Sequence, residues 1–138
     1  MIDTRTAPYA ALVLRLALGV MFLAHGRVKV FVFTPAGTVG YFVSIGFMGW
    51  LAYPVIVAEL LGGLMLILGV YPRWVAAVLS AELLVITSVH LGNGWQFNTP
   101  KGGWEYPLFM AAAALALALI GDGAHSLRPS PSLSPSPR

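Results

Sequence analysis

A single carboxylate inside an apolar segment is the feature that most constrains this chain. Residues 53–70 carry one charged side chain, Glu59, and a helix of that length, at about 1.5 Å per residue, crosses most of a hydrocarbon core of about 30 Å. An acid at such a depth is costly, so residues of this kind usually face the interior of a helix bundle and are often functional. The other polar groups that meet Glu59 should therefore define the site.

The composition indicates a protein that folds in a lipid bilayer. The chain is 58% hydrophobic and 9% charged, with a mean hydropathy of +0.81, whereas soluble domains carry about 25% charged residues. Its 8 Lys and Arg residues are scattered singly, which excludes the basic patch that nucleic acid requires. Without cysteine, thiolate nucleophiles and Cys-ligated clusters are also excluded. No haem, flavin or metal motif is evident, so a redox role would use a bound carrier.

Four apolar segments predict an all-α fold, a four-helix transmembrane bundle. They cover residues 8–26, 52–70, 74–91 and 106–120, and the Trp and Tyr residues lie at or beyond their ends, as expected of interfacial anchors. The first segment resembles a signal peptide, but it is long and is followed by Arg27 and Lys29, so we expect it to remain as a span. Thr34-Pro35 predicts a short interfacial or re-entrant helix near residues 35–45, between the first two spans.

Both termini should lie on the same side of the membrane, because four crossings separate them. Residues 1–127 form one membrane domain, and the Ser/Pro-rich residues 128–138 are predicted to be disordered, since they cannot bury apolar surface. The numbers of Lys and Arg residues near the span ends are nearly equal on the two sides of the membrane, and Arg138 adds one to the side of the termini. The positive-inside rule then predicts cytoplasmic termini in a bacterial inner membrane.

Depth counting arranges the buried charges in two layers. Counted from the cytoplasmic ends of their spans, Arg15 lies roughly 10 Å deep and Glu82 roughly 12 Å deep, so we expect a structural ion pair between them. Counted from the outer end, Glu59 lies roughly 9 Å deep, close to His25 and His90. The outer layer is the predicted ligand-binding or proton-handling site, with His25, Glu59, His90, Lys29, Trp104 and Glu105 as candidates.

Each candidate also has a purely structural interpretation. Glu59 can be a protonated acid hydrogen-bonded to a neighbouring helix, and His and Trp near span ends can be ordinary interfacial residues. Gly62-Gly63 can permit close helix contact. Imidazole and carboxylate ligands make a metal site of His25, Glu59 and His90 chemically possible, but these residues have no diagnostic spacing and no metal is predicted.

Three segments of the sequence, taken together, resemble those of a known protein family. They are residues 15–29 (RLALGVMFLAHGRVK), residues 59–69 (ELLGGLMLILG) and residues 102–107 (GGWEYP), and over about residues 10–127 the chain resembles the DoxX family of small four-span bacterial membrane proteins. The polar signature of that family falls here on Arg15, His25, Lys29, Glu59 and Glu105. The resemblance assigns no catalytic residue.

The resemblance implies a link to membrane redox systems. Family members include a subunit of a thiosulfate:quinone oxidoreductase and a component of an oxidative-stress assembly with superoxide dismutase and a sulfurtransferase. More distant relatives act as cargo receptors or assembly chaperones. The implied partners are thus the lipid bilayer and a membrane or soluble redox protein.

Three functional hypotheses remain open. The first is a quinone-interacting redox subunit, in which an apolar pocket capped by His and Glu holds the head group and supplies protons. The second is a non-catalytic scaffold, chaperone or cargo receptor. The third is a small proton-coupled transporter, although four spans without an inverted repeat leave little room for alternating access unless the chain forms a homo-oligomer.

Overall fold

The computed structural model describes residues 3–131, and their regular structure is helical. The α-helices are α1 (Ala7–Arg27), α2 (Thr34–Ser44), α3 (Ala52–Leu68), α4 (Pro72–His90) and α5 (Glu105–Ile120). A π-helical turn (Val28–Val32) continues α1, and 3₁₀ turns precede α3 (Gly49–Leu51) and follow α4 (Leu91–Asn93). The predicted all-α fold is confirmed, and α2 is the short helix expected between the first two spans.

Four of the helices have the composition of membrane spans. Within residues 3–131, three helical segments, Ala7–Val32, Gly49–Leu68 and Pro72–Asn93, are long and apolar enough to cross a bilayer. Helix α5 is also apolar but has 16 residues, about 24 Å at 1.5 Å per residue. The first span is longer than predicted, because the π-helical turn extends it past residue 26 to Val32. The chain is therefore a helical membrane bundle in contact with lipid.

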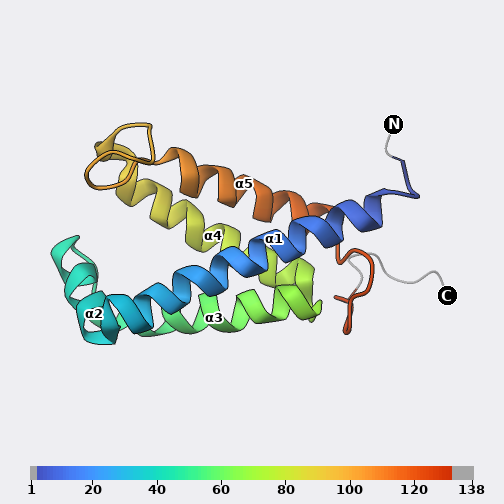
Figure 1. The fold of residues 1–138 in the computed structure, drawn as a ribbon, viewed down its shortest axis with the longest axis horizontal. Coiled ribbons are helices and arrows are strands. Elements are labelled where there is room, and N and C mark those ends of the chain that lie inside the picture. The colour runs from blue at the N-terminus through green and yellow to red at the C-terminus, as the bar shows by residue number, and fades with distance from the viewer. Residues whose placement is uncertain (1–2, 132–138) are drawn as a thin grey trace.

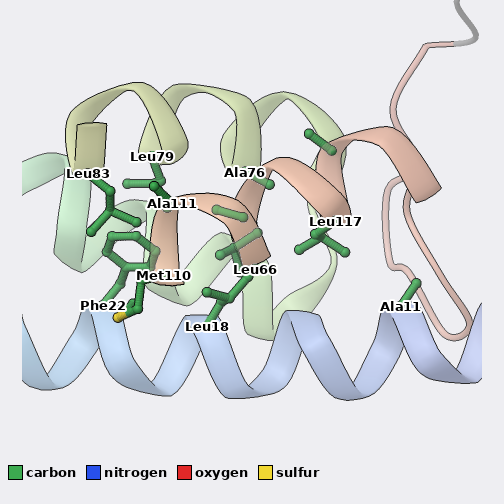
Figure 2. Close-up of a cluster of buried hydrophobic side chains, with 12 residues drawn as sticks. Ala11, Leu18, Phe22, Leu66, Ala76, Leu79, Leu83, Met110, Ala111 and Leu117 are labelled. Carbon is green, nitrogen blue, oxygen red and sulfur yellow. The ribbon is translucent and has the colours of Figure 1, made fainter. Parts of the chain in front are cut away.

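The helices associate as two pairs, α1 with α3 and α4 with α5 (Figure 1). One end of the bundle, here called the termini end, carries the α3–α4 turn and both ends of the described chain. The opposite end, here called the cavity end, carries α2 and the connection between α4 and α5. The pairs meet along a hydrophobic core that includes Leu18, Leu66, Leu79 and Leu117 (Figure 2).

Glycine residues let α1 and α3 touch through their backbones. A Cβ atom on Gly19 of α1 would lie 2.8 Å from the carbonyl oxygen of Gly63 in α3, and a Cβ atom on Gly63 would lie 2.8 Å from that of Gly19. The neighbouring Gly62 faces Leu79 of α4. Close helix contact at Gly62-Gly63 is thus confirmed, as is common for small residues in membrane bundles.

Arg15 fixes the path of the chain after α5. Its side chain is 1% exposed, and its guanidinium donates hydrogen bonds to the carbonyl oxygens of Asp122 (2.9 Å) and Ala124 (3.2 Å) and to the Ser126 hydroxyl. A planar fork of N–H donors suits several acceptors that approach from one loop. The two terminal nitrogens of the buried guanidinium therefore take their acceptors from the segment that follows the last span.

The predicted ion pair between Arg15 and Glu82 is wrong. Within residues 3–131 the salt bridge that forms joins Lys29 to Glu59. The prediction assumed that the first and third spans begin at the same level, but α1 begins beyond the α3–α4 turn. Arg15 therefore lies beside Gly69, where a Cβ atom would be 2.6 Å from the guanidinium. Glu82 comes ten residues after Pro72 in α4, roughly 15 Å further along the bundle.

The start of the Ser/Pro-rich segment is also held in place. The N–H of Arg128 donates to the Gly69 carbonyl (2.9 Å), and its carbonyl accepts the N–H of Tyr71 (2.8 Å). Ser130 donates to the Asp122 carboxylate through its N–H (2.7 Å) and its hydroxyl (2.6 Å). The predicted disorder is therefore wrong for residues 128–130, and residues 132–138 lie outside the described part of the chain.

Replacing Arg15 by alanine should destabilise the bundle. The substitution leaves several acceptors without their charged donor, and a hydrogen bond to a charged group contributes about 1.5–3 kcal/mol. We expect the midpoint of thermal unfolding in detergent to fall by about 10 °C. The matched control is Arg27→Ala, because Arg27 is an exposed arginine on the same helix. Equal effects of the two substitutions would contradict the structural role of Arg15.

Candidate functional site

A cavity of about 940 Å³ lies between the two helix pairs at the cavity end. All five α-helices and the α4–α5 connection contribute to its lining. Phe22, Leu83 and Met110 belong both to the lining and to the hydrophobic core (Figure 2), so the cavity rests directly on the core. Most of the lining is apolar or aromatic, and its ionisable groups are those of His25, Lys29, Glu59, Glu82, His90, Tyr41 and Tyr106.

Glu59 and Lys29 form an ion pair in this cavity. The Lys29 Nζ atom lies 2.7 Å from both carboxylate oxygens, and Glu59 is 2% exposed. Short contacts between opposite charges compensate the loss of hydration on burial when the geometry is good. An ammonium group carries three N–H donors, so Lys29 can bind Glu59 and still donate one hydrogen bond into the cavity.

A π-helical turn at the end of α1 contains Lys29. In this turn the N–H of Phe33 donates to the Val28 carbonyl, five residues earlier (3.0 Å), and π-helical turns occur frequently at functional sites. The buried hydroxyl of Thr38 in α2 lies 3.1 Å from the Lys29 carbonyl and 3.0 Å from the Thr34 carbonyl, and donates to this pair of acceptors. Helix α2 thus holds the turn that presents Lys29 to Glu59.

Glu82 belongs to the same cavity. It lies eight residues before the end of α4, and Glu59 lies seven residues after the start of α3, so both acids are about 10–12 Å from the cavity end of their helices. The Glu82 Oε1 atom is buried and has no hydrogen-bond partner within residues 3–131. A buried polar atom without a partner costs free energy, so this carboxyl group differs sharply from that of Glu59.

His25 and Tyr106 join α1 to α5 beside the cavity. Their rings stack with centroids 5.8 Å apart and an interplanar angle of 28°, and His25 Nε2 lies 3.2 Å from the Tyr106 hydroxyl. Sequence reasoning treated Tyr106 only as an interfacial aromatic residue. Tyr106 is the second residue of α5, and this position near the end of a span was only a weak signal of a role in the site.

His90 presents one ring nitrogen that can accept a hydrogen bond. Its Nδ1 atom lies 2.9 Å from the Ile86 carbonyl oxygen, and a carbonyl can only accept, so Nδ1 carries the proton. In the neutral ring Nε2 is then an acceptor. This atom lies near Gly102 of the α4–α5 connection, where a Cβ would be 3.7 Å away.

Trp104 and Glu105 hold the α4–α5 connection and are not among the residues that line the cavity. Trp104 packs edge-on against Trp95 with ring centroids 4.4 Å apart. The Glu105 carboxylate accepts the N–H of Phe97 (2.9 Å), and its own N–H donates to the Trp95 carbonyl (3.1 Å). Of the six candidates, the structure therefore brings His25, Lys29, Glu59 and His90 to one cavity.

The alternative of a metal site finds no support in the geometry. In the part of the chain that the structure describes, no three His, Cys, Asp or Glu side chains lie close enough to hold an ion. His25, Glu59 and His90 line the cavity without converging on one point.

Comparisons with known proteins identify relatives. The DoxX family model matches residues 10–91. A Bacillus subtilis (strain 168) protein named "Putative oxidoreductase CatD" is 29% identical over 119 residues, covering 86% of this chain and 84% of the relative. An uncharacterized protein of Haemophilus influenzae is 32% identical over 122 residues, covering 87% of this chain and 89% of the relative. No solved structure gives a significant match.

Removing one partner of the ion pair should cost more stability than removing both. Lys29→Met leaves the Glu59 carboxylate buried without its cation, a change that costs about 3–5 kcal/mol in buried pairs. The double variant Lys29→Met/Glu59→Leu removes both charges at similar volume and should recover most of that loss. Thermal unfolding in detergent of the wild type, both single variants and the double variant measures this. A double variant less stable than Lys29→Met would contradict the pairing.

Proposed function

The chain belongs to the DoxX family, and on that premise we propose that its cavity binds a membrane quinone as part of a redox system. The relative in Bacillus subtilis bears the name of an oxidoreductase, which supports a redox role for the family fold. We place the electron donor on a membrane or soluble partner protein, because this sequence contains no cysteine and no evident redox-group motif.

The cavity is the observation that carries the proposal. Its volume of about 940 Å³ is near the upper end of the range of about 300–1,000 Å³ that is usual for small-molecule sites. Such sites combine a predominantly apolar lining with a few placed polar groups, and this cavity has that composition. A membrane quinone matches this cavity chemically, because its ring carries two carbonyl oxygens and its tail is apolar.

The polar side chains suit both the oxidised and the reduced carrier. Lys29 retains an N–H donor beyond its contacts with Glu59, and a quinone carbonyl accepts such a bond. The Nε2 atom of His90 is an acceptor, which suits the hydroxyl groups of the reduced form. Histidine and carboxyl groups are also the usual side chains for proton transfer at near-neutral pH.

Filling the cavity should abolish quinone binding. Val89 of α4 lines the cavity, whereas Val78 of the same helix is 64% exposed and does not line it. We expect Val89→Trp to reduce the quinone that copurifies with the protein at least tenfold, relative to bulk membrane lipid, and Val78→Trp to leave it unchanged. Mass spectrometry of the extracted lipid provides the measurement. No quinone enrichment in the wild type would overturn the proposal and favour the scaffold hypothesis.

We also propose a bacterial cytoplasmic membrane location with both termini in the cytoplasm. The absence of cysteine allows single-cysteine labelling without background. Thr4 and Asn98 are exposed. Thr4 precedes α1 at the termini end, and Asn98 belongs to the α4–α5 connection at the cavity end. In intact cells an impermeant maleimide should label Asn98→Cys, and it should label Thr4→Cys only after the membrane is permeabilised. The reverse pattern would invert the topology.

A further inference from the structure

We propose that Glu82, and not Glu59, is the acid that contacts the ligand, and that it does so as a protonated hydrogen-bond donor to a neutral carbonyl group. This inference rests on the proposed function and specifies it, because it assigns different tasks to the two acids of the cavity and names the chemical class of ligand that the site accepts.

The two acids differ in their partners. Both oxygens of Glu59 lie 2.7 Å from the Lys29 ammonium. The Oε1 atom of Glu82 is buried in the same cavity and has no hydrogen-bond partner within residues 3–131. Glu59 is therefore committed to an ion pair inside the protein, while Glu82 has bonding capacity left for a ligand.

The charge balance of the cavity sets the state of Glu82. Lys29 and Glu59 neutralise each other, so an ionised Glu82 would leave one uncompensated negative charge in apolar surroundings. Burial of an unpaired carboxylate costs far more than burial of the neutral acid. Glu82 with its proton carries one O–H donor, which the cavity can offer to a ligand oxygen.

A protonated Glu82 selects neutral carbonyl compounds over organic cations. A carboxylic acid donates to a carbonyl oxygen, whereas it offers no charge to balance a cation. The aromatic lining, which includes Phe22, Phe42 and Phe97, could stabilise a cation through its ring faces, and an ionised acid nearby would strengthen that binding. Ligand class and Glu82 protonation are therefore linked.

Other ionisable groups face Glu82 from every neighbouring element, so the test must separate them. They are His25 and Lys29 on the first span, Glu59 on α3, His90 on α4 itself, Tyr106 on α5 and Tyr41 on α2. The chain has only five Asp and Glu residues. Glu59 and Glu82 lie inside the spans, whereas Glu105 is the first residue of α5 and accepts the N–H of Phe97, which makes a carboxyl signal assignable.

Infrared spectroscopy of the ligand-free protein tests the protonation state directly. In lipid nanodiscs at pH 7, the carbonyl band of a protonated carboxyl group should be present in the wild type and in the double variant Lys29→Met/Glu59→Leu, which removes both charges of the ion pair together, and absent in Glu82→Gln. A band that is missing from the double variant but present in Glu82→Gln, or no such band in the wild type, overturns the assignment whether or not quinone binds.

Ligand titrations test the contact. Decylubiquinone should shift the Glu82 band and should bind Glu82→Gln within about threefold of wild type, because the amide keeps a donor, but Glu82→Met about tenfold more weakly, as loss of one hydrogen bond predicts. Wild-type affinity should fall at alkaline pH as Glu82 loses its proton, and Glu82→Gln affinity should stay constant. The His25, His90 and Lys29 groups are unchanged in that variant, so they cannot produce the difference.

Three further outcomes would overturn the inference. If decylubiquinone binds without shifting the Glu82 band, the ligand contact is refuted. If it does not bind at all, the proposed function is refuted as well, while the protonated acid stays established. Binding of decyltriphenylphosphonium that strengthens with pH and is lost in Glu82→Gln refutes the neutral-ligand class and identifies the site as one for lipophilic cations.

Discussion

The free-energy cost of burying charge in an apolar bundle determines how the segments at both ends of this protein pack. Arg15 obtains its partners from the chain after α5, whereas Lys29 obtains the carboxylate of Glu59. Because a cation at membrane depth is expensive without partners, each contact also determines where a flanking segment lies. At the termini end, the segment after α5 is held against the α3–α4 turn. At the cavity end, the π-helical turn is held against α3.

The parts of the fold that could be predicted from the sequence are those encoded locally. The apolar composition of the spans, the short helix near residues 35–45 and the small residues Gly62-Gly63 each depend on a few neighbouring positions, and the structure agrees with them. The family resemblance also came from short segments, and the family match over residues 10–91 confirms it. Such signals carry no information on how far one helix is displaced along another.

That displacement explains the errors at the site. Counting from helix ends placed Glu82 opposite Arg15, but α1 extends beyond the α3–α4 turn, which moves Arg15 away from the acids. Trp104 and Glu105 were expected to cover the site, yet hydrogen bonds within the α4–α5 connection turn them toward Trp95 and Phe97. Tyr106 and Glu82 belong to the site because of tertiary packing, for which the local sequence gives at most a weak signal.

The cavity follows from a gradient of residue size along the helix interfaces. Toward the termini end, the hydrophobic core includes small residues such as Ala76, Ala114 and Ala118, which permit close helix packing. Toward the cavity end the facing residues are larger and aromatic, among them Phe22 and Tyr106, and rings of this size cannot interdigitate at the same separation. Apolar side chains could fill such a space and stabilise the bundle without any buried charge. This position instead holds an ion pair and a second carboxyl group, Glu82, whose Oε1 atom has no hydrogen-bond partner within residues 3–131, and these are the groups that the proposed ligand would use.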